Sequence, residues 1–447
     1  MSEKIGLIET ISIAVGGMVG GGIFAVLGVV AAGAGTAAWI AFTVAGVIAL
    51  CAGYSFIRLN TTGGELRSPI GQIEAISESR QLAGMVGWLL TFGYVGTMAM
   101  YAFAFGSYLT ELVGLSHLSG FPARPLFSVG GVVLFGGLNL LGAHASGRAE
   151  DALVATKVAI LLMFSGGGLY YGISHGTVAS GVNALSVGAL TAAAIAFVAF
   201  EGWELLLFDQ NSIENPQVTI RKGIYISIVG TTILYVLVAI VTTNLVSAST
   251  IKTHSETALA IAAEPLLGQL GFTLIAVAAV LSTGSALNAT MFSASRLSAQ
   301  ISEATAEDVQ QSDTESATDG GRDLSSYSQS TPTHRSPGAT SDTAPPARTI
   351  LVIGLLTAIF TLYGSLNSIT SFASGAFMTI FGTVSILAFE TRDSLTSTII
   401  PFVGAVGSAV ALIALLWNLH RTNPDVLVTV AVIWAVVLSV YWVPRRT

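Results

Sequence analysis

Charged residues are scarce in this sequence. Asp, Glu, Lys and Arg make up only 10% of its 447 residues, and 52% are hydrophobic. Soluble domains carry about 25% charged residues. This balance excludes a soluble globular enzyme and indicates an integral membrane protein with many spans.

Residues that support catalysis, metal binding or disulfide chemistry are also rare or scattered. Cys51 is the only cysteine, so no disulfide framework exists. The six histidines lie without metal-ligand spacing, and the sequence has neither a G-x-x-x-x-G-K-[ST] loop nor a Ser/His, paired-Asp or HExxH constellation. We therefore expect no enzyme, no cofactor, no metal site and no nucleic-acid partner. The expected partners are a small molecule and the lipid bilayer.

Long apolar runs, by contrast, are abundant. Twelve are long and continuous enough to cross a bilayer as helices, whereas the strands of a membrane barrel would be short and alternating. They lie at about 8–33, 36–57, 82–112, 126–142, 150–172, 187–210, 223–246, 266–295, 348–364, 367–389, 397–417 and 425–443. The expected fold class is an all-α integral membrane protein with twelve transmembrane helices.

The basic residues predict the orientation of these spans. With the N-terminus inside, fourteen Lys and Arg fall in inner segments and three in outer loops, as the positive-inside rule requires. We expect a multi-pass protein of the cytoplasmic membrane with both termini inside. The inner segment 299–347 is polar and nearly free of aliphatic residues. We expect a disordered cytoplasmic loop there, either a regulatory segment or a tolerated linker.

The first span contains an unusual concentration of glycine. The stretch "AVGGMVGGGIFAVLG" contains Gly16, Gly17, Gly20, Gly21 and Gly22. Because glycine is a poor helix former, we interpret this stretch as a break in the helix. The amides of residues 20–22 would then attract a carboxylate, and the preceding carbonyls would suit an ammonium group. Close helix packing through small residues is the alternative.

A second apolar run is interrupted five spans later. In "AFVAFEGWELLLFDQNSIENP", Glu201 and Gly202 interrupt the run and Glu204 follows. Breaks at corresponding positions in two halves are the best sequence indication of a transporter's binding site. We expect a transporter core at 1–390. Its repeats, of opposite orientation, span about 8–172 and 187–389, and two further helices lie within 397–447.

Three motifs resemble those of a known superfamily. "GGMVGGGIF" resembles the G-x-x-[IV]-G-[SAG]-G-I-F signature of the amino acid–polyamine–organocation transporters. "FVAFEGWE…ENP…IRKGI" and "HSETALAIAAEPLLGQLG…LSTGSALNATMFSASR" are similar to its span 6 and its span 7–8 regions. The likeness covers roughly residues 5–298. It implies the leucine-transporter-type fold of five plus five inverted helices, and it does not name a substrate.

The resemblance also implies where an amino acid would bind. Its carboxylate would meet the glycine amides of span 1, and its amino group would meet backbone carbonyls on both sides of the two breaks. The substrate-binding residues implied in this way are Ile13, Gly17, Gly20, Gly21, Gly22, Val198, Ala199, Phe200, Glu201 and Trp203. Val198 departs from the superfamily, which often has a gating aromatic there; Phe197 could substitute.

Two carboxylates accompany the second break. A carboxylate at bilayer depth is costly and is a candidate functional residue by default. Glu204 matches a position that is often acidic in the superfamily, and its role is either coupling or capping of the broken helix. Glu201 does not match the superfamily pattern. It could pair with a cationic substrate side chain, take up a proton, or make a structural hydrogen bond.

Lys157 is the basic residue that lies inside a predicted span. Burial favours the neutral amine, so this lysine could release a proton near neutral pH. The resemblance implies that the amine replaces the bound sodium of related transporters and points at span 1 carbonyls and at Ser282 and Thr283 of span 8. Snorkelling to the inner surface is the alternative for Lys157. For the hydroxyls, the alternative is a hydrogen bond within the membrane helices.

The predicted function is secondary active transport of amino acids by alternating access, with proton-coupled uptake. The coupling residues are Lys157, Glu204, Ser282 and Thr283, and sodium is the second candidate for the coupling ion. The alternatives are a cationic amino acid or polyamine transporter or exchanger, and a non-transporting amino acid sensor. The residues do not predict which amino acid binds, the stoichiometry or the oligomeric state.

Overall fold

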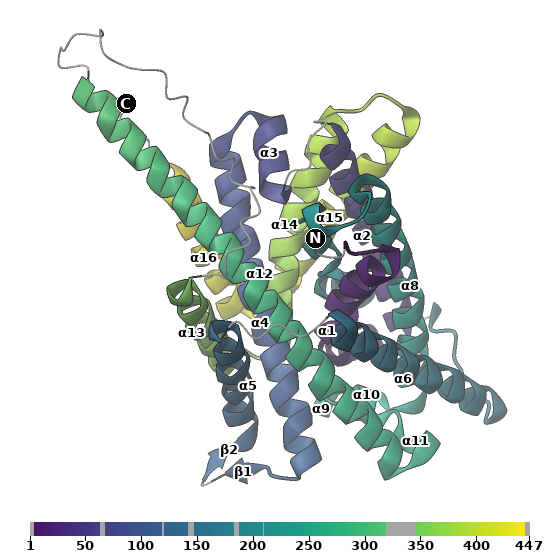
Figure 1. Cartoon of the computed structure of the whole chain (residues 1–447). Coiled ribbons are helices and arrows are strands. Elements are labelled where there is room, and N and C mark those ends of the chain that lie inside the picture. The colour runs from purple at the N-terminus through teal and green to yellow at the C-terminus, as the bar shows by residue number, and fades with distance from the viewer. Residues whose placement is uncertain are drawn as a thin grey trace.

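Helices account for nearly all of the architecture. The computed structural model describes residues 4–62, 68–118, 120–141, 147–182, 187–208, 210–318 and 346–442. These residues form a helical bundle with a short antiparallel hairpin, β1 (His117–Leu118) and β2 (Phe121–Pro122), at one end (Figure 1).

The long helices follow the apolar runs closely. They are α1 (Leu7–Ala34), α2 (Ala38–Thr62), α4 (Arg80–Val113), α5 (Ala123–Leu140), α6 (Gly147–Ser174), α8 (Pro216–Leu245), α12 (Gln269–Thr318), α13 (Ala347–Tyr363), α14 (Leu366–Glu390), α15 (Leu395–Thr422) and α16 (Pro424–Trp442). Serine side chains accept hydrogen bonds from the first-turn amides of α4, α14 and α15 and so fix where these helices begin.

Shorter elements connect the long helices. They are η1 (Gly35–Ala37), α3 (Pro69–Ser77), α7 (Val187–Ala196), η3 (Phe197–Phe200), η4 (Trp203–Leu207), η5 (Gln210–Ser212), α9 (Ala248–Thr253), α10 (Ala258–Ile261) and α11 (Glu264–Leu267). Together, α7, η3 and η4 take the place of the sixth predicted span.

The length and composition of the helices identify a multi-pass membrane protein. Nine stretches within the described residues are long and apolar enough to cross a membrane. One of them, Leu7–Thr61, includes both α1 and α2. Helix α13, with 17 residues, is too short to be among the nine. The count of twelve crossings therefore stays a prediction, as do the boundaries of the two repeats.

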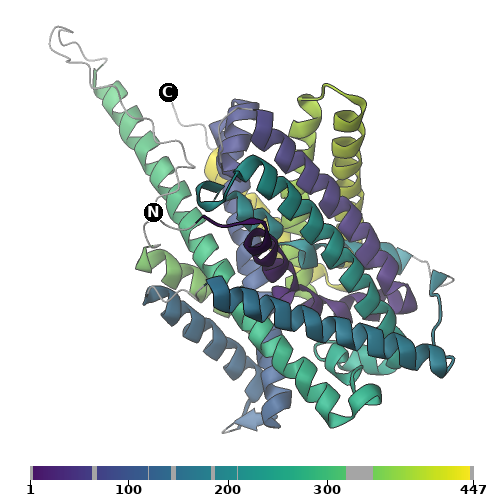
Figure 2. The ribbon, with the colours of Figure 1, turned by 45° about the vertical axis from the view of Figure 1, so that its right-hand side comes forward.

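Helix α1 lies in the middle of the bundle (Figures 1 and 2). It packs against α6, α7, α8 and α12 as well as the short elements η3 and η4. Almost every residue from Met18 to Ala31 is buried. Helix α6 lies beside α8 and crosses α12 in both views. A buried helix with neighbours on all sides can carry small residues wherever a neighbour comes close.

The break that we expected in span 1 is absent from the structure. Helix α1 runs from Leu7 to Ala34 without interruption, and none of its glycines at positions 16 to 22 has a positive φ. Each glycine costs about 1 kcal/mol of helix propensity relative to alanine. Close approach of neighbouring helices offsets this cost, as the alternative of small-residue packing predicted.

The polar segment expected to be disordered from residue 299 is helical in its first part. Helix α12 continues to Thr318 and projects beyond the rest of the bundle (Figures 1 and 2). Extending an existing helix needs no new nucleus, and Ala, Glu and Gln in this stretch are good helix formers. The remainder of the expected loop, 319–345, lies outside the described residues.

Contacts beside the N-terminus tie several elements together. The backbone of Ile5 pairs with the segment after η4: its N–H donates to Ser212 O at 2.9 Å and its carbonyl accepts from Glu214 N–H at 2.9 Å. Nearby, the buried Asn60 amide donates to Gln210 Oε1 at 2.7 Å and accepts from Gln72 Nε2 at 2.8 Å. The start of the chain, α2, α3 and η5 are thus joined.

Candidate functional site

The sixth span is interrupted where the sequence changes from apolar to "EGWE". Helix α7 ends at Ala196 and tightens into η3; Glu201 is then extended, with φ −72° and ψ 145°. Gly202 has φ +122°, a conformation that L side chains rarely adopt. A β-carbon there would also lie 2.7 Å from Cα of Gly17. Glycine is therefore required at position 202 both for its backbone conformation and for lack of space.

The span 1 glycines are the positions at which neighbouring elements approach α1. A β-carbon at Gly20 would lie 2.6 Å from Cβ of Ala286 in α12, and one at Gly21 would overlap the ring of Tyr101 in α4. At Gly22 it would lie 2.8 Å from the carbonyl oxygen of Ala199 in η3. Gly17 faces Gly202, as described above. The structure thus brings Gly17 and Gly22 against the broken span, whereas Gly20 and Gly21 lie against α12 and α4.

Backbone carbonyls of α1 near the break accept hydrogen bonds from side chains of surrounding helices. Tyr235 of α8 donates its hydroxyl to Met18 O at 2.7 Å and lies 3.0 Å from Ala199 O. Ser282 of α12 donates to Val19 O at 2.8 Å. A carbonyl has two lone pairs, so it can accept a side-chain donor in addition to its helical partner. These bonds converge on one turn of α1, immediately beside the break in span 6.

Lys157 of α6 joins the same turn of α1 from the other side. Its side chain is 2% exposed, and Nζ donates to Gly16 O at 3.3 Å. Its electrostatic partner is Glu150, about two turns earlier in α6. The sequence placed Lys157 and Ser282 beside span 1 carbonyls, and both lie there. Thr283 instead donates to Ala279 O of its own helix at 2.7 Å.

The two carboxylates of the break are buried. Glu201 Oε2 accepts a hydrogen bond from the Tyr101 hydroxyl at 3.0 Å. Glu204 Oε2 accepts one from Gly202 N–H at 2.9 Å, which replaces a backbone bond lost at the break. The second oxygen of each carboxylate is buried without a hydrogen-bond partner among the described residues.

The remaining predicted residues around the break have largely structural partners. Val198 N–H donates to Ser374 Oγ at 3.1 Å, and Trp203 stacks edgewise on Phe56, with ring centroids 5.4 Å apart. Phe200 stacks on the Tyr235 ring at 5.3 Å. Ile13 lies in the continuous helix α1, where helical geometry pairs its carbonyl with the amide of residue 17. It is the predicted residue least involved with the break.

Sequence reasoning missed the tyrosines that surround the break. Tyr101 and Tyr235 supply hydroxyl donors to Glu201 and to α1, and Tyr94 of α4 lies close to Glu204. All three are almost completely buried. A tyrosine in the middle of an apolar run usually needs a hydrogen-bond partner for its hydroxyl, and that signal could have found them.

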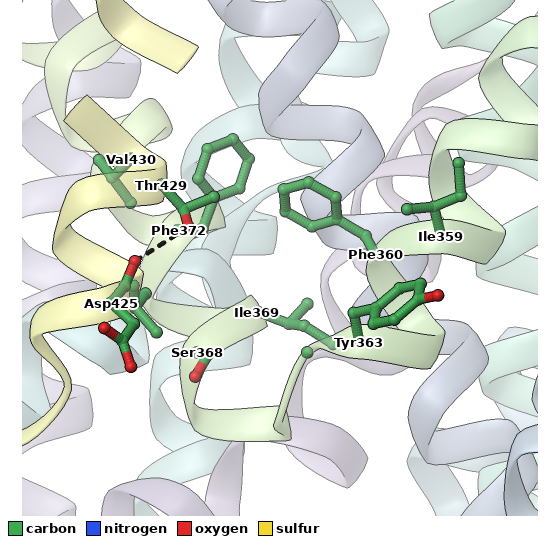
Figure 3. Close-up of a pocket in the computed structure, with 11 residues that line it drawn as sticks. Ile359, Phe360, Tyr363, Ser368, Ile369, Phe372, Asp425, Thr429 and Val430 are labelled. Atoms are coloured by element: carbon green, nitrogen blue, oxygen red, sulfur yellow. Dashed lines mark hydrogen bonds between the residues drawn. The ribbon is translucent and has the colours of Figure 1, made fainter. Parts of the chain in front are cut away.

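A cavity of about 380 Å³ lies away from this site, between α13, α14 and α16 (Figure 3). Phe360, Ile369 and Phe372 line it with apolar surface, and Asp425 lies at its side on α16. None of the residues predicted for substrate binding or coupling lines it. Among the described residues there is also no cluster of three or more His, Cys, Asp or Glu that could hold a metal ion.

Comparison with known proteins identifies the family. A family model described as amino acid permease matches residues 5–438. The chain belongs to the amino acid permease family. The resemblance to the amino acid–polyamine–organocation superfamily, based on the span 1 and span 6 motifs, is thereby confirmed.

Individual relatives agree with this assignment. The permease is 31% identical to the inner membrane transport protein YbaT of Escherichia coli, over 65% of this chain and 67% of that protein. It is 33% identical to an uncharacterized protein of Methanocaldococcus jannaschii, over 65% of this chain and 66% of that protein. The serine/threonine exchanger SteT of Bacillus subtilis is 24% identical over 68% and 69% of the two chains.

A solved structure supports the fold alone. A crystal structure of the Eremococcus coleocola manganese transporter aligns with a TM-score of 0.55 and 14% identity, covering 97% of this chain and 92% of that one. The expected all-α membrane fold of the leucine-transporter type is thereby confirmed.

Proposed function

We propose that this permease carries amino acids into the cell across the cytoplasmic membrane by proton-coupled alternating access, with both termini inside. The family assignment and relatives such as SteT, named a serine/threonine exchanger, support an amino acid as the substrate. The excess of basic residues in alternate loops supports the orientation. The proposal makes the permease a transporter and not an enzyme.

In this proposal the substrate binds between α1 and the break in span 6. Spans 1, 2, 6 and 7 rock against spans 3, 4, 5 and 8. The amides of Gly20, Gly21 and Gly22 become carboxylate donors when α1 opens at the glycines, where helix propensity is lowest. Carbonyls of η3, including Ala199 O, receive the substrate's amino group in place of the Tyr235 hydroxyl.

The observation that carries the coupling role is the contact between Lys157 Nζ and Gly16 O, next to the bond from Ser282 to Val19 O. A buried ammonium on the carbonyls of α1 ties α6 to α1 while it holds its proton. Once the proton leaves, the neutral amine binds those carbonyls more weakly, and α1 is free to move. Sodium is the second candidate, because the same oxygens could coordinate a cation.

A cationic substrate is the second candidate for specificity. The carboxylate of Glu201 has an unpaired oxygen beside the proposed substrate position, and an ammonium or guanidinium side chain would complement it. A competition panel that includes lysine, arginine and polyamines beside serine, threonine and branched-chain amino acids would separate the two classes.

The test is uptake of labelled amino acid into proteoliposomes with an imposed pH or sodium gradient. We expect accumulation driven by an inwardly directed proton gradient. Lys157→Ala should transport without responding to that gradient, whereas Lys222→Ala, which removes an exposed lysine in α8, should behave as wild type. An unchanged response in Lys157→Ala would contradict the coupling role. Binding without any uptake would identify an amino acid sensor.

A further inference from the structure

The break in span 6 buries two carboxylates close together in the sequence. Glu201 is 2% and Glu204 1% exposed. The two carboxylates interact electrostatically with each other. Each has one oxygen held by a single hydrogen bond and one oxygen without a partner among the described residues.

Within the described residues, the surroundings of this pair supply hydroxyls but no positive charge. Helix α4 presents Tyr94 and Tyr101, and α8 presents Tyr235. Neither carboxylate forms an ion pair with any residue in the described part of the chain. Lys157 has its electrostatic interaction with Glu150 and not with the break. The aromatic rings on the Trp203 side, Phe56 and Phe381, are uncharged.

Two ionised carboxylates cannot share such a place without compensation. Burial of one unpaired charge already costs several kcal/mol, and a like charge nearby adds to that cost. Neighbouring carboxyl groups that cannot both ionise hold a proton for this reason, as in the aspartic proteases. Of the two side chains, Glu204 is the one that stays ionised, because a backbone amide donates to its carboxylate and stabilises the negative charge.

We infer that Glu201 and Glu204 share one bound proton in this structure, in which both are buried, and that Glu201 carries it. The Tyr101 hydroxyl of α4 then holds the neutral Glu201 carboxyl in place. This hydrogen bond joins span 6, which is proposed to rock, to span 3, which is proposed to stay fixed. The proton comes from water on the side to which the site opens. When it leaves, two charges remain at the break and favour the open, hydrated form.

The effect on transport rests on the proposed function, whereas the bound proton itself does not. The resident proton closes the site and is distinct from the proton that Lys157 is proposed to carry. Glu201→Gln mimics the protonated side chain permanently. It should therefore remove the dependence of closure on pH.

The first test needs no transport. Infrared spectra of the purified, substrate-free permease at pH 7 should show the carbonyl stretch of a protonated carboxyl group that shifts in D₂O. Glu201→Gln should abolish this band, Tyr101→Phe should shift it, and Glu9→Gln, on the exposed first turn of α1, should leave it unchanged. Absence of the band in wild type, or its survival in Glu201→Gln, would overturn the inference.

The second test is the pH profile of uptake in proteoliposomes. Above a threshold pH, wild-type uptake should fall by up to about tenfold per pH unit, the limit for loss of one proton. Glu201→Gln should flatten this alkaline fall, and Lys157→Ala should retain it. A Glu201→Gln profile equal to that of wild type overturns the role in closure. If wild type takes up no amino acid while the infrared band behaves as expected, the proposed function fails and the bound proton stands.

Discussion

Helix α1 and the sixth span touch through two glycines, yet only the sixth span is broken. Cα of Gly202 lies 2.8 Å from where a β-carbon on Gly17 would be, so the two backbones are in direct contact. In α1 the glycines remain helical, whereas Gly202 has φ +122°. The difference lies in the polar groups nearby. At the break in the sixth span, two backbone amides without helical partners find other acceptors. Gly202 N–H donates to Glu204 of the same span, and Val198 N–H donates to Ser374 of α14.

This comparison teaches that glycine content alone does not locate a break in a membrane helix. Glycine lowers the cost of leaving the helix, but in a water-free environment each freed amide must find another acceptor. The additional hydrogen bonds of α1 beside the break come from donors to its carbonyls, namely Tyr235, Ser282 and Lys157. None of them replaces an acceptor for its amides.

The largest effect should follow Gly202→Ala, which changes the glycine of the broken sixth span in its contact with Gly17. The new methyl group would meet Cα of Gly17 and would need a strained positive φ. Together these penalties should destabilise the fold by about 3 kcal/mol or more. Thermal unfolding in detergent should show a lower Tm, and uptake should be lost. Gly230→Ala in α8, where nothing lies within 4 Å of the added carbon, is the matched control. A variant with wild-type Tm would show that the break tolerates a side chain.

A smaller loss should follow Gly21→Ala on the continuous side. Helix propensity improves by up to about 1 kcal/mol, but the methyl group overlaps the Tyr101 ring, and overpacking costs about 1–3 kcal/mol. We expect a lower Tm, partly restored when Tyr101→Leu is added. Gly33→Ala, in the same helix with its nearest neighbour 3.8 Å away, should raise the Tm. If Gly21→Ala also raised it, packing would not explain the glycines of α1.

A third comparison separates donors to α1 from donors within a helix. Ser282→Ala removes the bond to Val19 O, and such interhelical bonds contribute about 0.6 kcal/mol on average. Thr283→Val replaces a hydroxyl that bonds its own helix with a side chain of similar shape, so its effect should be smaller. Tm and the response of uptake to a pH gradient should both change more in Ser282→Ala. Equal changes would remove Ser282 from the coupling site.

The smallest effect is expected outside both regions, where Arg58 of α2 forms an ion pair with Asp393 at 3.1 Å. The hydrogen bond from Arg58, followed by that from Ser397, lowers the pKa of the Asp393 carboxyl. A carboxyl group whose pKa is lowered by folding stabilises the fold at any pH above its ordinary pKa. This contribution is lost as the pH falls through the lowered pKa. Asp393→Asn should therefore lower the Tm slightly at pH 7 and not at strongly acidic pH. A difference that grew with acidity would contradict this sign.

The sequence was sufficient to place the helices, because a bilayer imposes a length and a polarity that few residues can violate. Predicted span 8–33 corresponds to α1 at 7–34, and predicted span 367–389 corresponds to α14 at 366–390. The same argument could not locate the end of α12. Beyond the apolar run, the end of α12 depends on helix propensity and on the helix that is already formed. The polar composition of this segment had instead indicated disorder.

The site was predicted in part. The residues of "FEGWE" and Lys157 could be found because ionisable residues are unexpected in apolar runs. Ser282 was found only through the resemblance to the superfamily. The continuity of α1 could not be predicted, because it depends on which neighbours lie against each glycine. Tyr101 and Tyr235 were missed for a similar reason, since the partner of each hydroxyl comes from a helix distant in sequence.

The pairing of Ile5 with Ser212 and Glu214 has a practical consequence. It fixes the start of the chain to the segment that follows the broken span, so the start of the chain and the break must move as one body. A spectroscopic label placed just ahead of Ile5 would therefore report the position of the sixth span. A second label at the start of α5, near the β1–β2 hairpin, would provide a reference in one of the spans proposed to stay fixed. The distance between the two labels would follow the transport cycle without any modification of the binding site.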